Sequence, residues 1–216
     1  MKRRTLDLLF SIGGTVIAGL LLFAGIVLSA NASFATTYVA DQLGQQNIVF
    51  KTADTLTDEE KKAPCLVQYA GQQLTTGKQA ECYANNFIGL HLKSTAGGLT
   101  YAELGTPQSE LRAKVAAAQA ANDPALAGLQ THLAEMSAAR ETVFKGETLR
   151  GLLLTTYGFS EFGTKAGQAA TIAYLAAALM LLMSIAGFVH AARTPATQTF
   201  AAPQPAQPHE RQAAAV

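Results

Sequence analysis

The chain has 216 residues, of which 49% are hydrophobic and 14% are charged, well below the roughly 25% of charged residues in ordinary soluble domains. Its formal net charge is +1 and its basic residues form no stripe, so the composition indicates no nucleic-acid partner. The sequence also lacks a Gly-x-Ser-x-Gly elbow, a Walker loop and a dinucleotide fingerprint. The apolar excess lies in two segments near the ends of the chain.

Residues 8–30 and 167–190 are predicted to be transmembrane helices. Neither segment contains Asp, Glu, Lys or Arg, and about 20 apolar residues cross the 30 Å core of a bilayer. The first segment has an alternative interpretation as a signal peptide, because Ala30, Asn31 and Ala32 form a small-x-small cleavage pattern. We favour an uncleaved anchor, since 23 apolar residues exceed the about 7–15 of a signal-peptide core.

The basic residues predict the orientation of the two spans. Three of them lie in residues 1–7, directly before the first span, and Arg193 follows the second, so both termini are expected in the cytoplasm. The tail, residues 191–216, contains four of the seven prolines and is expected to be disordered. Residues 31–166 then lie outside the cytoplasmic membrane, where they can form one small domain.

Small residues recur at every fourth position in each predicted span. They are Ser11, Thr15 and Gly19 in the first span, and Ala169, Ala173 and Ala177 in the second. Such faces let helix backbones approach closely, so the two spans are expected to pack on each other or on a partner, self-association included; chance in an Ala-rich chain is the alternative. Tyr174 is predicted to be an anchor at the outer membrane interface.

The central region, residues 31–166, is predicted to be mostly helical. Helical spacing of apolar residues after the first span suggests that this helix continues to Gly44. A short extended piece at residues 47–50 follows, and then Thr57 and Glu60 form a capping box that begins a short helix.

Cys65 and Cys82 are the two cysteines of the chain. Both fall in the region expected outside the cytoplasm, where disulfides persist, so we expect a bond between them. Two buried free thiols are the alternative, and a redox site is disfavoured because neither cysteine belongs to a C-x-x-C motif.

Further helices are predicted in the second half of the central region. Residues 78–93 read as an amphipathic helix whose inner face offers Cys82, Phe87, Leu90 and His91. Two helix-start signals follow, at Thr106-Pro107 and at Asn122-Asp123-Pro124. They predict an antiparallel helical hairpin over about residues 107–145. Residues 147–163 are expected to form a membrane-proximal segment that lies at the membrane surface or packs beneath the domain and leads into the second span.

Four runs resemble a family of actinobacterial two-span membrane proteins. They are YAGQQLTTG at 69–77, CYANNFIGLHL at 82–92, AGGLTYAELG at 96–105 and GETLRGLLL at 146–154. The resemblance implies a bacterial plasma-membrane protein with the architecture described above. Some members carry the automatic label "aromatic ring-opening dioxygenase", but the resemblance implies no catalytic residues.

That label can be examined through its chemistry, because ring-opening enzymes of this kind commonly hold Fe(II) with two His and one carboxylate. The central region offers His91 and His132, with Glu135 three residues after His132 as the matching carboxylate. We expect these to be ordinary surface residues rather than a metal site, and we predict no cofactor.

The sequence therefore favours a non-enzymatic scaffold or accessory binding module for a membrane or envelope complex. Two alternatives remain: an enzyme acting outside the cytoplasm, and a sensor that signals inward through a separate partner.

Overall fold

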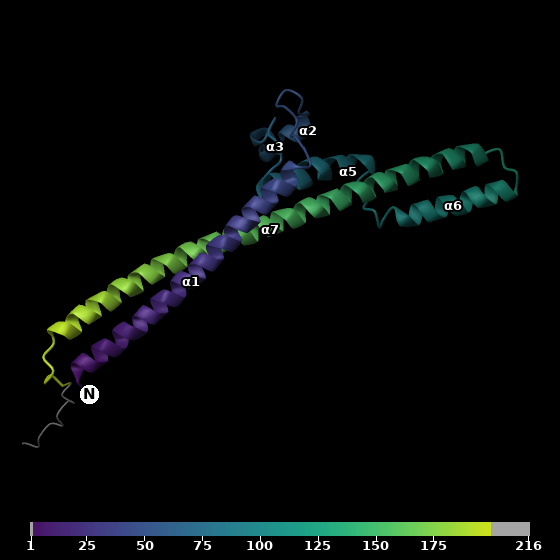
Figure 1. Cartoon of the computed structure of the whole chain (residues 1–216). Helices are drawn as coiled ribbons and strands as arrows, with labels where there is room; N and C mark the ends of the chain where they lie inside the picture. The colour runs from purple at the N-terminus through teal and green to yellow at the C-terminus, as the bar shows by residue number, and fades with distance from the viewer. Residues whose placement is uncertain (1, 200–216) are drawn as a thin grey trace, which may run out of the picture. The chain divides into compact units, whose positions relative to one another are not determined.

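The computed structural model describes residues 2–199, and these residues are mainly helical (Figure 1), as the sequence predicted. The elements in chain order are α1 (Arg3–Gly44), α2 (Asp58–Lys61), α3 (Pro64–Gln68), α4 (Gly77–Cys82), the π-helix η1 (Tyr83–Ile88), α5 (Gly89–Thr95), α6 (Gly105–Ala120) and α7 (Leu126–Arg193). Within this range the β-structure consists of isolated antiparallel bridges, one of them between Val49 and Gln73 in the predicted extended piece. Residues 200–216 of the predicted tail lie outside the described residues.

The chain divides into two compact units. Unit 1 contains Met1–Ser29 and Gln168–Val216, and unit 2 contains Ala30–Gly167. Both α1 and α7 are long enough and apolar enough to span a membrane.

In unit 1, α1 packs against the last part of α7 through small residues. The buried positions on α1 are Ser11, Gly14, Ala18 and Gly25, and those on α7 are Ala170, Ala177, Ser184 and Ala191. Alternating steps of three and four residues, or multiples of seven, keep these positions on one seam, as in a left-handed helix pair. A Cβ atom added to Gly14 would collide with Ser184 Oγ, and one added to Gly187 would collide with Ser11 Oγ.

The small-residue faces predicted from the sequence are therefore only partly used in this contact. Ser11 and Ala177 are buried and Ala173 is half-buried, whereas Thr15, Gly19 and Ala169 face away from the other helix. The reason is geometric: a step of four residues advances about 40° around an α-helix, so a repeated step of four leaves the contact seam within two steps.

Tyr174 packs between the two helices of unit 1, near the predicted outer end of the first span, and its role as an interfacial anchor stays a prediction. Its hydroxyl lies 3.1 Å from Ser29 Oγ. A Cβ added to Gly25 would lie 2.7 Å from the tyrosine ring, so this glycine provides the space into which the ring fits.

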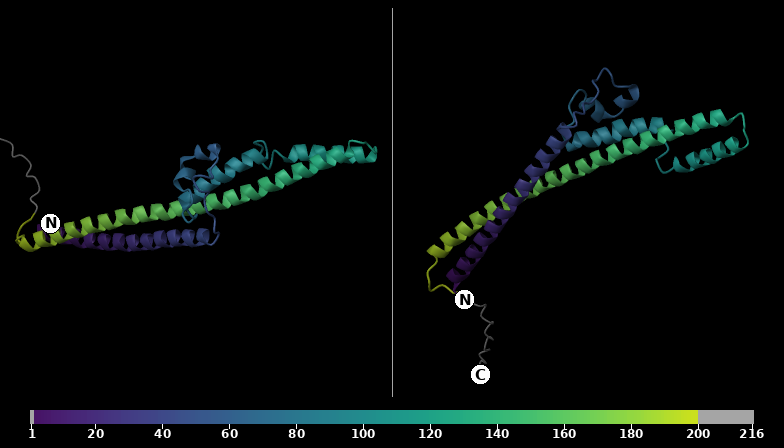
Figure 2. Two further views of the ribbon diagram at one scale, coloured as in Figure 1. Left: turned by 90° about the horizontal axis from the view of Figure 1, so that it is seen from above. Right: turned by 45° about the vertical axis from the view of Figure 1, so that its right-hand side comes forward.

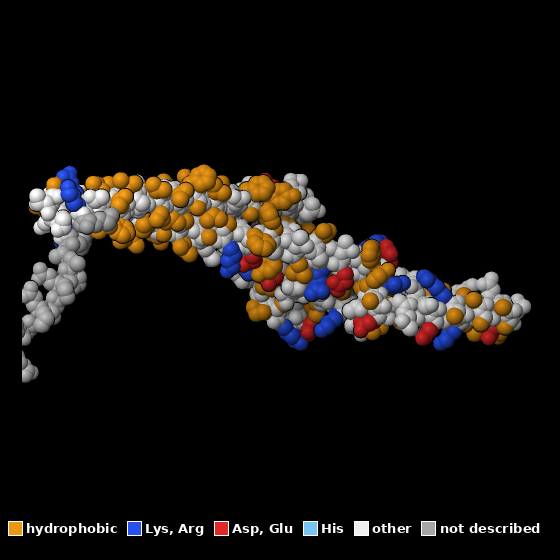
Figure 3. Space-filling view, turned by 90° about the horizontal axis from the view of Figure 1, so that it is seen from below, with side chains coloured by type: hydrophobic (Ala, Val, Ile, Leu, Met, Phe, Trp, Pro, Cys, Tyr) orange, Lys and Arg blue, Asp and Glu red, His pale blue; other side chains and the backbone are white. Residues whose placement is uncertain are grey.

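The outward faces of the unit 1 helices carry large apolar side chains. Examples are Phe10 at 77% exposure and Leu20 at 65% on α1, with Leu175 at 68% and Leu182 at 65% on α7. On the face seen in Figure 3, hydrophobic side chains cover the paired helices, and basic side chains appear at the end near the N-terminus. This surface is apolar where that of a soluble helix pair would be charged.

Unit 2 has its own hydrophobic core. Its members are Val39, Leu43, Phe50, Leu56, Leu66, Leu74, Ala80, Cys82, Ala84, Ile88, Leu92, Ala96, Leu104, Val143 and Leu153. They come from both long helices and from every short helical segment between Leu66 and Leu92. The end of α1 is therefore a structural part of this core, which explains why the helix continues to Gly44 as the sequence indicated.

The α6 and α7 helices form the predicted hairpin, seen side by side in Figures 1 and 2. Gln108 is buried between them and donates to Ser137 Oγ at 2.9 Å, while Arg140 Nη1 donates to Gln108 Oε1 at 2.7 Å. The first helix begins at Gly105, without a side-chain cap from the predicted Thr106.

Residues 147–163 do not form an element distinct from the hairpin and the second span, because α7 is continuous from Leu126 to Arg193. Glycines suggested breaks there, but two of them serve close packing instead. A Cβ at Gly146 would overlap the Leu92 side chain, and one at Gly163 would lie 2.7 Å from the Ala35 side chain.

Candidate functional site

A disulfide fixes the centre of unit 2. Cys65 in α3 is bonded to Cys82 at the end of α4, with the Cα atoms 6.0 Å apart, which confirms the predicted pairing. Within residues 2–199 neither cysteine is free. Asn86 also donates to Cys65 Sγ at 3.3 Å, so the bond is held against the following π-helix.

The π-helix η1 changes which side chains of residues 78–93 face the core. Cys82 is buried as predicted, but Phe87 and Leu90 are only half-buried and His91 is exposed; Ala84, Ile88 and Leu92 are buried instead. A π-helical turn contains more residues than an α-helical turn, so it rotates the following side chains out of the α-helical register. Such turns are common at functional sites.

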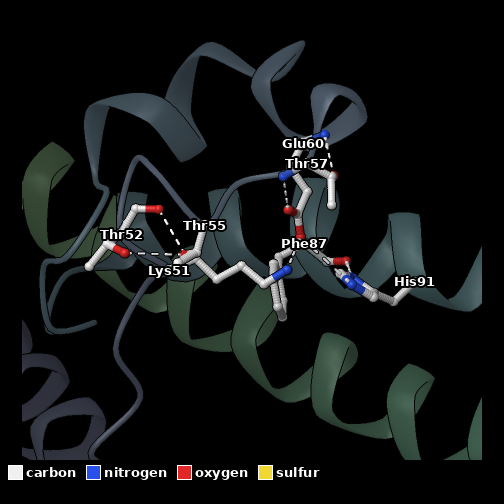
Figure 4. A network of polar contacts seen from close by, with 7 residues as sticks. All are labelled: Lys51, Thr52, Thr55, Thr57, Glu60, Phe87 and His91. Atoms are coloured by element: carbon white, nitrogen blue, oxygen red, sulfur yellow. Dashed lines mark hydrogen bonds and ion pairs between the residues drawn. The ribbon is translucent and has the colours of Figure 1, made fainter.

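Glu60 is the one charged side chain among the buried residues of the described chain, at 1% exposure. Its Oε2 accepts a hydrogen bond from the Thr57 backbone N–H at 2.7 Å, and the Thr57 hydroxyl accepts one from the Glu60 N–H at 3.2 Å. This is the predicted capping box. Lys51 Nζ lies 2.8 Å from Glu60 Oε1 and reaches it across the Phe87 ring (Figure 4).

His91 lies on the other side of the same carboxylate. Its Nδ1 is 2.7 Å from the Phe87 carbonyl, and because a carbonyl only accepts, this nitrogen carries the proton. Its Nε2 lies 3.7 Å from Glu60 Oε1, too far for a hydrogen bond, and forms an ion pair with it only when this nitrogen is protonated as well. The network joins the loop before α2 to α5 and leaves the carboxylate fully engaged, which fits a structural role.

Burial alone would raise the pKa of Glu60, but the hydrogen bonds from Lys51 and Thr57 outweigh it and hold the pKa below its ordinary value. The unfolded chain therefore binds this proton more readily than the folded chain. The network contributes stability above the unfolded value of about 4.5, and this contribution is lost as the pH falls through the lower folded pKa.

We expect Glu60→Gln to lower the free energy of unfolding at pH 7 by about 1.5–3 kcal/mol, the usual value of hydrogen bonds to a charged group. The variant should also lose less stability than the parent between pH 5 and pH 3. Thermal unfolding across this range measures both effects. Glu59→Gln is the control, since Glu59 is 58% exposed and pairs only with Lys62 at the surface. Equal pH profiles for the parent and Glu60→Gln would contradict this account.

A groove of about 550 Å³ lies in unit 2, lined among others by Pro64, which precedes Cys65, and by Asn86. Its walls come from α2, α3, η1, α5, the loop after α5 and the part of α7 around Val143 and Arg150. The apolar lining includes Pro64, Leu90 and Leu99. A groove of this size is large enough for several residues of an extended chain rather than a single ion.

The polar floor of the groove centres on Arg150. Its Nη1 donates to Glu147 Oε2 and its Nη2 donates to Asn85 Oδ1, both at 3.2 Å. Its Nε is buried and has no hydrogen-bond partner in the described part of the chain. Asn86 lies next to Asn85 in the π-helix and donates to Cys65, which leaves its side-chain carbonyl available. The floor thus offers both donors and an acceptor, the combination that a peptide group requires.

The structure does not assemble the residues considered for a metal site. His91 belongs to the Glu60 network, whereas His132 and Glu135 are exposed on α7. Among residues 2–199, no three His, Cys, Asp or Glu side chains form a group that could hold a metal ion.

Asn85, Asn86 and Arg150 did not emerge from the sequence as site residues. The two adjacent asparagines were a usable signal, because they interrupt an otherwise apolar helical run at residues 82–92. Arg150 lies 64 positions beyond Asn86, and no local pattern connects them.

No protein-family model matches the chain, and neither a curated protein nor a solved structure matches it. The resemblance to two-span actinobacterial membrane proteins therefore stays a prediction, and the role of the groove has to be inferred from its own chemistry.

Proposed function

We propose that this chain is a two-span protein of the bacterial plasma membrane whose unit 2 is a non-enzymatic binding module outside the cytoplasm. The observation that carries the membrane location is the exposure of the two long helices. Only 22% of the most apolar window of α1 and 11% of that of α7 are buried in the chain. Core helices of a soluble protein would be mostly buried, so lipid is the natural cover for these surfaces.

Two features support the proposed orientation. Lys2, Arg3 and Arg4 precede the first apolar segment and Arg193 follows the second, which favours cytoplasmic ends. The Cys65–Cys82 bond is the second, because disulfides persist in compartments outside the cytoplasm.

The groove supports a binding role for unit 2. Several of its charges are already paired, Glu59 with Lys62 and Glu147 with Arg150, and they are not poised as acid and base. The free hydrogen-bonding groups of the floor match a peptide backbone, and the apolar walls match its side chains. We infer that an extended segment of a membrane or envelope protein occupies the groove, so that unit 2 acts as an accessory module of a complex.

Photocrosslinking in whole cells tests this role. A benzoylphenylalanine at Leu99, which lines the groove and is 44% exposed, should give one defined adduct with another protein. The same residue at Ala113, exposed on α6 and away from the groove lining, should give none. Asn85→Ala should reduce the adduct from Leu99 by removing one anchoring amide. Equal labelling from both positions, or none from either, would overturn the binding role of the groove.

A further inference from the structure

Three aromatic side chains form an exposed cluster in unit 2. The ring centroids of Phe34 and Tyr38 are 5.7 Å apart. The centroid of Phe159 lies 6.4 Å from that of Phe34 and 5.9 Å from that of Tyr38. Their exposures are 61% for Phe34, 48% for Tyr38 and 38% for Phe159. The rings therefore pack on each other but leave much of their surface uncovered, which is costly in water.

The cluster exists because the two long helices approach closely next to it. The Ala35 side chain occupies the space that a Cβ at Gly163 would fill, and the Ala32 Cβ would lie 3.6 Å from a Cβ at Gly167. Small residues on both sides bring the backbones together and leave the large rings at the edge of this contact. The rings are thus held in place by the fold.

We propose that this aromatic cluster lies in the headgroup layer of the outer leaflet and fixes the depth of the chain in the bilayer; this rests on the proposed membrane location. Length along α1 supports this depth. About 20 helical residues counted from Leu8 cross the 30 Å hydrocarbon core and end near residue 27. Phe34 lies about 10 Å farther along the same helix. Because helix side chains lean toward the N-terminus, its ring reaches back toward the core and into the headgroup layer.

The residues that flank the cluster also suit the headgroup layer. Lys165 is exposed and lies between Phe159 and the apolar segment of α7, a suitable place for a cation beside lipid phosphate. Tyr38 adds a hydroxyl at the outer side of Phe34, and aromatic rings with polar tips are typical of this layer. The cluster also continues the uncharged surface of α1, which runs without Asp, Glu, Lys or Arg from Leu8 to Ala40. Lipid is therefore favoured over a partner protein as its occupant.

The chain contains no tryptophan, so one introduced tryptophan reports its own depth. Phe34→Trp and, as a second position, Phe159→Trp are made in the full chain and reconstituted into phosphatidylcholine vesicles whose lipids carry bromine either near the headgroup or deep in the acyl chains. Leu179→Trp, 60% exposed in the apolar part of α7, is the reporter for the core, and Phe144→Trp, 50% exposed on the hairpin part of α7, is the reporter for water.

We expect Phe34→Trp to be quenched more strongly by the shallow bromines than by the deep ones. Leu179→Trp should show the reverse order, and Phe144→Trp should be quenched by neither kind of lipid. If Leu179→Trp is quenched while Phe34→Trp and Phe159→Trp are not, the membrane location stands and the cluster faces water or a protein partner, which overturns this inference. Stronger quenching of Phe34→Trp by the deep bromines than by the shallow ones also overturns this inference. If no reporter is quenched, the proposed membrane location fails as well.

Discussion

Replacing Cys65 or Cys82 with alanine is expected to lower the free energy of unfolding by about 3 kcal/mol, the value for a disulfide that closes a short loop. The two residues are 17 positions apart, and the bond ties α3 to α4 at the edge of the core. Several segments of unit 2 are only four to seven residues long and would not be stable alone. Thermal unfolding of the full chain should show a drop of several degrees for each variant.

The double variant separates loss of the bond from loss of the side chains. Cys65→Ala with Cys82→Ala should cost little more than either single change, because the first change already removes the bond. Reduction of the parent with dithiothreitol should give a similar loss. If the double variant lost as much free energy of unfolding as the two single variants together, each side chain would act independently. That result would contradict the stabilising role of the bond.

Gly14→Leu is expected to lower the free energy of unfolding of the unit 1 helix pair by about 2–3 kcal/mol. This is the cost of forcing a large side chain into a packed contact. A Cβ at this position already meets Ser184, and the rest of a leucine would push the helices apart. Gly187→Leu, opposite Ser11, should have a similar effect. Unfolding in mixed micelles with rising dodecyl sulfate measures the change.

Gly13→Leu is the matched control, because nothing lies within 4 Å of a Cβ at Gly13. The control differs from Gly14→Leu by one position on the same helix, so lipid solvation and helix propensity are nearly equal. Its effect should lie within about 0.5 kcal/mol or be slightly stabilising, since leucine favours a helix over glycine. Equal losses from the two variants would contradict the observed seam.

Local signals in the sequence predicted the local features well. Thr57 and Glu60 form the capping box because both partners lie within one helical turn. Gly97 and Gly98 adopt positive φ angles after α5, as expected where a helix ends in glycine. The disulfide followed from there being two cysteines and from the expected compartment.

Features that depend on contacts distant in sequence were missed. In the sequence alone, Gly146 and Gly163 indicate helix breaks. The structure shows that they serve packing, because Leu92 lies against Gly146 and Ala35 lies against Gly163. The seam of unit 1 was predicted only in part for the same reason: Ser11 and Ala177 belong to it, but Gly14 and Gly25 are identified only by their contacts with Ser184 and Tyr174. The groove likewise needs Arg150 beside Asn85, a contact across 65 residues.

The proposed topology places unit 2 outside the cytoplasm and both ends of the chain inside, and cysteine accessibility in whole cells distinguishes it from the reverse orientation. The two native cysteines are bonded to each other, so an added one is a clean target. Ser109→Cys, exposed on α6, should react with a membrane-impermeant maleimide on intact cells, and Ala206→Cys should react only after the cells are opened. The reverse pattern, or labelling of both positions on intact cells, would contradict the account.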